Sequence, residues 1–193
     1  MSFKSVLAAS AALLLAGCIS FGEDPPESLL TLTPTSVAPA GSGATSNAGT
    51  AIALVEFEVP AALDVTRVPV HVSETEIAYL QDAVWVERPA RLFRRLLGET
   101  LRARSNRVVV DGDDPGVMAE DRLQGVIRQF GYDVPSGSVV MVFDAIRNRP
   151  GSTVETRRFE ARVPGIAPDV VSVRPALNQA ANEVAGQVAD WVR

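Results

Sequence analysis

Residues 123–163, LQGVIRQFGYDVPSGSVVMVFDAIRNRPGSTVETRRFEARV, decide the fold, because they hold three consecutive segments of β-strand character. The first, residues 123–134, ends at the turn PSG, and the second, residues 138–148, leads into the turn NRPG. In the third, residues 153–163, apolar and charged side chains alternate, as in a strand with one face in the core and the other in water. Three such segments joined by short turns predict an antiparallel meander.

Two amphipathic helices are predicted on either side of this meander. Downstream, Ser172 is suited to cap a helix with Pro175 in its first turn, where proline is tolerated. Apolar residues then follow helical spacing as far as Trp191. Upstream, Pro89 suits the first turn of a helix that ends at residues 105–106, with a leucine-rich stripe and with arginines off that stripe. Each helix therefore has one apolar side to bury.

Further segments with strand character surround the earlier helix: 51–59, 67–72, 76–80, 83–87 and 108–110. Between the third and fourth of these, Gln81 and Asp82 predict the tight turn of a hairpin. The simplest way to bury both helix stripes is to place them against the same side of a sheet. The sequence therefore predicts an α+β fold, with a mixed, mostly antiparallel sheet and two main helices packed on one face.

The composition excludes several classes of protein. The chain has 193 residues, which fits one domain with an appendage, and its hydrophobic content of 47% excludes wholesale disorder. A formal net charge of -5 argues against binding to nucleic-acid phosphates, which needs a basic patch. The single cysteine and the single histidine, His71, exclude an intramolecular disulfide, a cysteine-rich zinc site and paired-histidine metal sites.

Residues 1–17 have the parts of a bacterial export signal. Lys4 supplies the positive charge, and residues 6–15 form an apolar segment that is too short to span a membrane. The sequence Leu-Ala-Gly-Cys at residues 15–18 resembles the bacterial lipobox. That resemblance implies lipidation of the thiol of Cys18 and removal of residues 1–17. Because stable anchoring takes two acyl chains or more, such a modification confines a protein to a bilayer surface.

The rest of the chain divides into a tether and a domain. Residues 18–27 contain two prolines and a glycine, and we expect them to form an extended, lipidated tether. Residues 28–193 form the domain. Within it, residues 28–33 favour a short first strand, and residues 34–50, which are rich in Ala, Ser, Gly, Thr and Pro, are expected to be a flexible loop.

No motif for a catalytic, metal or cofactor site is present in the sequence. The acidic run that begins at Asp111 does not fit an EF-hand, because Arg122 stands where the calcium loop needs a glutamate. His71 lies in a strand-like run, and sequence alone defines no partners for a catalytic triad. We therefore expect a protein that is not an enzyme and that has no cofactor and no metal.

Two groups of residues are candidates for a partner interface. The arginines after Pro89 are either the solvent face of an amphipathic helix or a site for an acidic partner or anionic headgroups. The aromatic residues on either side of the predicted turn at 81–82 are either core aromatics or an exposed interface patch. The candidate interface residues are Tyr79, Trp85, Arg91, Arg94 and Arg95.

The order of these features resembles the ABC-type transport auxiliary lipoproteins, the PqiC-like group. The resemblance covers most of the chain after Cys18. It rests on the short strand at residues 30–32, the strand that runs into residues 60–64, the segment between Tyr79 and Trp85, the helix opened by Pro89, residues 159–163, and the alanine-rich helix that ends at Trp191. The long segment at residues 34–50 and the lack of aromatic residues before residue 30 depart from the family pattern.

The resemblance implies a lipoprotein of a Gram-negative bacterium that faces the periplasm. Ile19, rather than an aspartate, follows Cys18, and this favours the outer membrane. The implied partners are a membrane-anchored MCE-domain protein and an ABC permease and ATPase, which together move phospholipid or other hydrophobic molecules between the two membranes. The chain would act by docking rather than by catalysis, and a homo-oligomer is left open. The alternative is a structural or assembly lipoprotein of the outer membrane.

Overall fold

Seven strands and two α-helices make up the described chain, for which a computed structural model gives residues 28–47, 50–105, 107–111 and 119–193. In chain order, the elements are β1 Ile52–Glu58, the 3₁₀ helix η2 Ala61–Leu63, β2 Arg67–His71, β3 Ile77–Val84, α2 Pro89–Ser105, β4 Val109–Asp111, β5 Asp121–Asp133, β6 Ser138–Asn148, β7 Glu155–Pro164 and α3 Val170–Val192. The predicted signal peptide and tether, with Cys18, lie outside the described residues.

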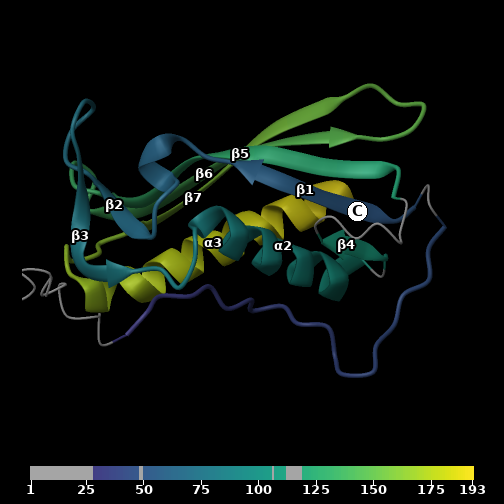
Figure 1. Cartoon of the computed structure of the whole chain (residues 1–193), viewed down its shortest axis with the longest axis horizontal. Coiled ribbons are helices and arrows are strands. Elements are labelled where there is room, and N and C mark those ends of the chain that lie inside the picture. Colours follow the sequence, from purple (N-terminus) through teal and green to yellow (C-terminus); the bar gives the residue numbers. More distant parts are fainter. Residues whose placement is uncertain (1–27, 48–49, 106, 112–118) are drawn as a thin grey trace, which may run out of the picture.

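The long strand β5 is the centre of the sheet. One of its edges pairs with β6 in antiparallel fashion along its length, and β6 pairs in the same way with β7, so the predicted meander is confirmed. The other edge of β5 takes two strands in turn. Its first half pairs with β1 and its last two residues pair with β2, while β4 and β3 lie outside these strands (Figure 1).

The sheet is mixed, as predicted, but its core is partly parallel, so the expectation of a mostly antiparallel sheet is wrong. Both β1 and β2 run parallel to β5, and β4 runs parallel to β1. The reason lies in the connection between β1 and β2, which leaves the sheet at η2 and returns to the same edge of β5. Because the chain does not reverse direction there, β1 and β2 have the same orientation. The pattern of apolar residues within a strand does not show whether the strand pairs in parallel or antiparallel fashion.

The hairpin predicted within residues 76–87 is also wrong, because β3 is one continuous strand. Asp82 has a φ of 55°, a left-handed conformation that aspartate adopts more readily than most residues. The pairing register between β2 and β3 shifts at this point. The left-handed residue therefore makes a bulge in a strand rather than a turn between two strands.

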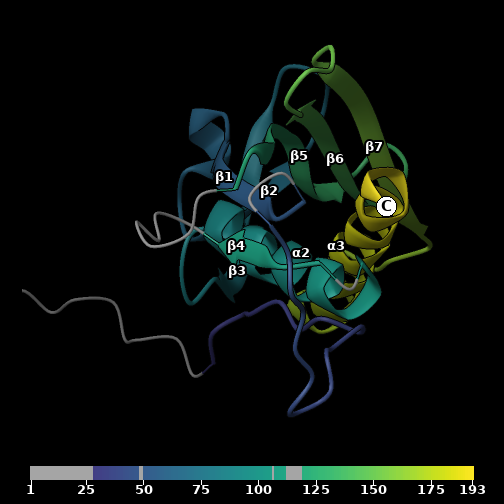
Figure 2. The same cartoon turned by 90° about the vertical axis from the view of Figure 1, so that its right-hand side faces the viewer.

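Both helices pack on one face of the sheet, as predicted (Figure 2). Helix α2 has the predicted bounds, and its buried residues form the expected leucine-rich stripe. Helix α3 begins three residues earlier than a cap at Ser172 predicts, because Asp169 is the cap: its carboxylate accepts a hydrogen bond from the Ser172 backbone N–H. Pro175 therefore lies beyond the first turn of the helix. No helix among the described residues is long and apolar enough to cross a membrane.

Residues 29–47 run along the outer side of the two helices, and we call this segment the strap (Figure 1). Its first contact is with the sheet, where Leu30 forms a single parallel bridge with Trp85, so the predicted first strand is reduced to one bridge. Farther along, Thr33 and Thr35 donate backbone hydrogen bonds to side chains of α3, and Ala38 donates one to α2. The flexibility expected of residues 34–50 stays a prediction for measurement in solution.

Candidate partner-docking surface

Trp85, one of the five candidate interface residues, lies in the core. Its side chain is 2% exposed and stacks on Phe130, with 5.5 Å between ring centroids and an interplanar angle of 26°. Its backbone N–H donates to the carbonyl oxygen of Thr66, and this bond fixes the end of β3 against the segment before β2. Trp85 is therefore not available at the surface of this structure. Of the two interpretations that the sequence allowed, core aromatic or exposed interface residue, the first holds for Trp85.

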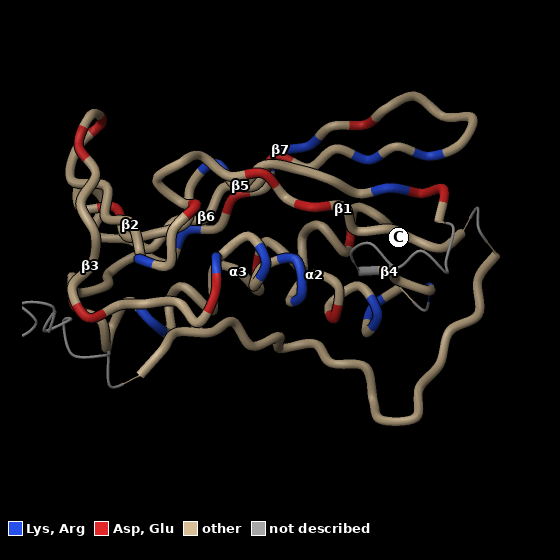
Figure 3. Tube along the Cα trace, viewed as in Figure 1, with Lys and Arg blue, Asp and Glu red and all other residues tan. Residues whose placement is uncertain are grey.

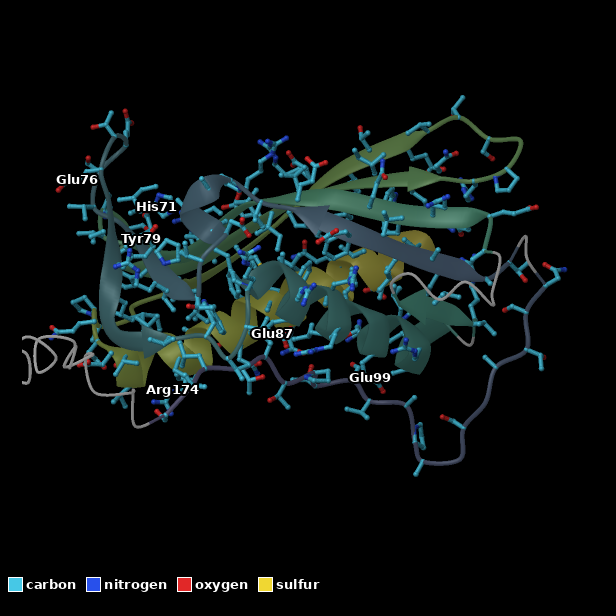
Figure 4. All side chains as sticks on the ribbon, viewed as in Figure 1. His71, Glu76, Tyr79, Glu87, Glu99 and Arg174 are labelled. Atoms are coloured by element: carbon cyan, nitrogen blue, oxygen red, sulfur yellow. The ribbon has the colours of Figure 1, made fainter. Side chains whose placement is uncertain are left out.

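Tyr79 is half-buried and lies on the β2–β3 part of the sheet (Figure 4). The guanidinium of Arg67 lies 3.9 Å from the centre of its ring, a cation–π contact. Its hydroxyl is 3.4 Å from the carbonyl oxygen of Ala62 in η2. Tyr79 therefore links β3 to η2, the segment between β1 and β2, and remains partly exposed.

Figure 3 shows positive positions on α2, and the three candidate arginines lie on the first turns of that helix. Arg91 and Arg95 are exposed, and Arg94 is half-buried. Arg95 forms an ion pair with Glu87, just before the helix. Arg88, the residue that precedes the helix, forms an ion pair with Asp64 at 3.2 Å. This end of α2 is therefore a mixed-charge surface rather than a purely basic one.

A groove of about 370 Å³ lies between this end of α2 and the segment after β1. Charged side chains line its rim, and Phe57, Val59 and Ala90 supply apolar lining. Its polar lining residues are Glu56, Asp64, Thr66, Glu87, Arg88 and Arg91. A groove lined by apolar side chains and by charges of both signs suits a short segment of a partner protein, because such a segment can bury apolar side chains and keep its polar groups paired. Arg91 is the one candidate interface residue that lines this groove.

A second cluster of charges, which sequence reasoning missed, lies on the face of the sheet away from the helices. Asp144 of β6 accepts hydrogen bonds from Arg158 of β7 at 2.6 and 2.8 Å and from Arg128 of β5 at 2.9 Å. The hydrogen bonds from Arg158, followed by that from Arg128, lower the pKa of Asp144 from 3.8 to about 2. Strand register creates this cluster, since Asp144 is opposite Arg158 in the β6–β7 ladder. The alternation of charged residues in 153–163 was its only sequence signal.

His71 lies at the end of β2, half-buried, near the tip of the β2–β3 connection (Figure 4). Within the part of the chain that the structure describes, no group of three or more His, Cys, Asp or Glu residues is placed to hold a metal ion. The rest of the acidic run that begins at Asp111, from residue 112 on, lies outside the described residues.

A family model for the ABC-type transport auxiliary lipoprotein component matches residues 30–189, and the chain belongs to this family. The matched range runs from the first buried residue of the strap almost to the end of α3. The protein is thus an auxiliary lipoprotein component of an ABC-type transport system, and its family implies a membrane lipid anchor. The family resemblance drawn from the sequence is confirmed.

Solved structures share this fold at low sequence identity. Protein XCC0632 from Xanthomonas campestris has a TM-score of 0.71 at 15% identity, and the alignment covers 85% of this chain and 93% of that one. A crystal structure of an uncharacterised protein has a TM-score of 0.66 at 14% identity, covering 86% and 100%. A PelC dodecamer from Paraburkholderia phytofirmans scores 0.49 at 15% identity, covering 79% and 95%. No curated protein matches the chain.

Proposed function

We propose that this protein is anchored to the outer membrane through lipid on Cys18, faces the periplasm and docks onto the MCE-domain protein of an ABC transport system. The proposed system moves phospholipid or another hydrophobic cargo between the inner and outer membranes. The observation that carries the proposal is the family match over residues 30–189, which includes every described strand, α2 and all but the last three residues of α3. Ile19 after the lipidated cysteine supports the outer membrane as its location.

The physical purpose of docking is to shield the cargo from water. Exposing an acyl chain to water costs about 0.8 kcal/mol for each methylene group, so free diffusion of a phospholipid across the periplasm is strongly disfavoured. An anchored domain that holds the far end of an MCE-domain protein completes a protected route. In this proposal, the permease and ATPase supply the energy, and the present chain supplies position.

The groove at the start of α2 is the proposed contact site for the MCE-domain protein. It combines apolar lining from Phe57 and Val59 with an exposed rim that includes Arg91. Arg95 lies one turn farther along the helix and is also exposed. Charges at the rim of an interface affect the rate and selectivity of association more than its final affinity. Reversing these two charges is therefore expected to weaken capture of the partner without unfolding the domain.

The test is capture of partners by the native, lipidated protein from solubilised membranes, followed by mass spectrometry. The wild-type chain is expected to recover an MCE-domain protein together with a permease and an ATPase. The double variant Arg91→Glu with Arg95→Glu is expected to recover less of them. Arg193→Glu, a charge reversal at the other end of the molecule, is the matched control and should behave as wild type. Recovery of outer-membrane β-barrel assembly factors in place of a transport system would instead support the structural or assembly role.

A further inference from the structure

Three large apolar side chains are exposed at the end of the molecule where the described chain begins. Leu29 and Val86 are each 51% exposed, and Val171 is 75% exposed. Leu29 and Val86 lie on neighbouring segments, since the Val86 backbone N–H donates to the carbonyl oxygen of Leu30 at 2.8 Å. We call these three residues, together with Arg174, the anchor-end patch.

The spacing of the strap along α3 places Leu29 level with the first turn of that helix. Thr33 bonds to Asn178 and Thr35 to Asn182, so two strap residues advance past four helix residues. Those lengths agree, because extended chain rises about 3.3 Å per residue and helix about 1.5 Å. Going back four residues from Thr33 therefore corresponds to eight or nine helix residues, which is the turn that contains Val171.

The cation in the patch is available to an anionic group. Arg174 is exposed, and it has no ion-pair partner among the residues that the structure describes. It lies one turn after Val171 on α3 (Figure 4). Glu76, an acidic residue at the tip of the β2–β3 connection, lies just before β3, whereas Val86 of the patch lies just after that strand. The eight residues of β3 span about 26 Å, so the two residues are far apart. The patch thus combines apolar side chains with a cation and lies away from the acidic tip.

The length of the tether connects this patch to the bilayer. Nine residues separate Cys18 from Ser28, and they span about 30 Å at most. The β6–β7 turn, where Val154 is 58% exposed, lies at the opposite end of the molecule from the start of the strap (Figure 1). The anchor therefore keeps the patch within reach of the membrane surface, whereas the β6–β7 turn lies at the far end of the molecule (Figure 1).

We infer that the anchor-end patch rests on the phospholipid surface that holds the acyl chains of Cys18. The apolar side chains Leu29, Val86 and Val171 enter the boundary between headgroups and acyl chains, and Arg174 contacts headgroup phosphate. This contact orients the domain with the β6–β7 turn away from the bilayer. The inference rests on the lipid anchor of the proposed function and is independent of which protein partner the domain binds.

The test uses the native lipidated protein in vesicles of phosphatidylethanolamine and phosphatidylglycerol. Cys18 is the only cysteine in the chain, and acylation consumes its thiol, so an introduced cysteine becomes the single site for an environment-sensitive fluorophore. Labels at Val86→Cys and Val171→Cys are expected to shift to shorter emission wavelength and to be quenched by nitroxide-bearing lipids. The matched control is Val154→Cys at the opposite end, which should show neither effect; the exposed fraction of Val154, 58%, lies between those of Val86 and Val171. Adding Arg174→Glu to Val171→Cys should reduce the quenching.

The outcomes separate this inference from the proposed function. The mass of the N-terminal peptide is measured first, and an unacylated Cys18 would overturn both. With Cys18 acylated, labels at residues 86 and 171 that stay as water-exposed as the label at residue 154 would overturn the inference alone. Protection that appears only when the MCE-domain protein is added would also overturn it, because the patch would then be a protein interface.

Discussion

Arg147 and Asp121 form a buried, two-point ion pair that joins the end of β6 to the start of β5. Arg147 Nε lies 3.0 Å from Asp121 Oδ1, and Arg147 Nη2 lies 2.7 Å from Oδ2. Arg107 adds a third contact to the same carboxylate at 2.6 Å and also donates to the carbonyl oxygen of Val192 at the end of α3. Burial raises the pKa of Asp121, but the hydrogen bonds and charges of the two arginines outweigh this, and the pKa lies below 3.8.

Asp121→Ala is predicted to destabilise the domain strongly. Removing the carboxylate leaves Arg147, which is 5% exposed, as a buried charge without its partner, and breaking such pairs costs about 3–5 kcal/mol. Urea unfolding followed by circular dichroism measures the loss in free energy of unfolding. The control is Asp190→Ala, which breaks exposed ion pairs with Arg104 and Arg193 and should cost about 0–1 kcal/mol. Equal losses for the two variants would contradict the role given to the buried pair.

Asp144 is predicted to make stability fall in acid. Its pKa in the folded protein is about 2, below the ordinary value of 3.8 that it regains on unfolding, so its charged form favours the folded state. This contribution is complete above pH 3.8 and is lost as the pH falls through that value toward about 2. Thermal unfolding across this range should show a smaller acid-induced drop for Asp144→Asn than for wild type. Because Arg128 and Arg158 are exposed, added salt should reduce the difference.

Local hydrophobic patterns predicted most helices and strands, because the spacing of apolar residues within a segment indicates which of its faces is buried. The meander of β5, β6 and β7 follows from alternation and from two short turns, and α2 follows from a leucine stripe that begins at Pro89. The predicted start of α3 is three residues too late because both Asp169 and Ser172 are good caps, and only the fold decides between them.

Partner choice between distant strands was not predictable in the same way. β1 and β2 pair with the same edge of β5, one after the other. This arrangement depends on the connection through η2, which joins the two strands without reversing the chain. The two aromatic candidates at β3 differ for a related reason: Asp82 makes a bulge in the strand, and beyond it Trp85 is buried in the core, whereas Tyr79, before it, is half-buried. The sequence around an aromatic residue beside a turn-forming pair does not show whether its side chain lies on the buried or the exposed face of the sheet.

Gly131→Ala is predicted to destabilise the domain by forcing β2 away from β5. A Cβ at this position would lie 2.2 Å from the carbonyl oxygen of Pro69 in β2, and a backbone atom has little freedom to move. Overpacking of this kind costs about 1–3 kcal/mol. Gly43→Ala is the control, because a Cβ there meets nothing within 4 Å. The midpoint of urea unfolding should fall for the first variant only, and an unchanged midpoint for Gly131→Ala would show that β2 is held loosely.

Asn182→Ala is predicted to release the strap from α3 while leaving the core intact. The Asn182 side chain accepts hydrogen bonds from the backbone N–H and the hydroxyl of Thr35 at 2.7 and 3.0 Å and donates to the carbonyl oxygen of Thr33 at 2.9 Å. Each such bond contributes about 0.5–1.5 kcal/mol in net terms, and water replaces the lost partner because the strap is exposed. Amide hydrogen exchange of residues 33–38 should therefore accelerate, with little change in the free energy of unfolding.

Gln179→Ala is the matched control for this change. Gln179 is an exposed neighbour on α3, and the side-chain hydrogen bonds from α3 to Thr33 and Thr35 come from Asn178 and Asn182, so its truncation should leave exchange at residues 33–38 at the wild-type rate. The comparison also tests the flexibility predicted for residues 34–50. If the wild-type strap already exchanges as fast as the Asn182→Ala variant, the strap is mobile in solution and its bonds to α3 are marginal. If it is protected in wild type and freed in the variant, one asparagine on α3 holds the segment that follows the anchor, and the orientation of the domain near the membrane depends on it.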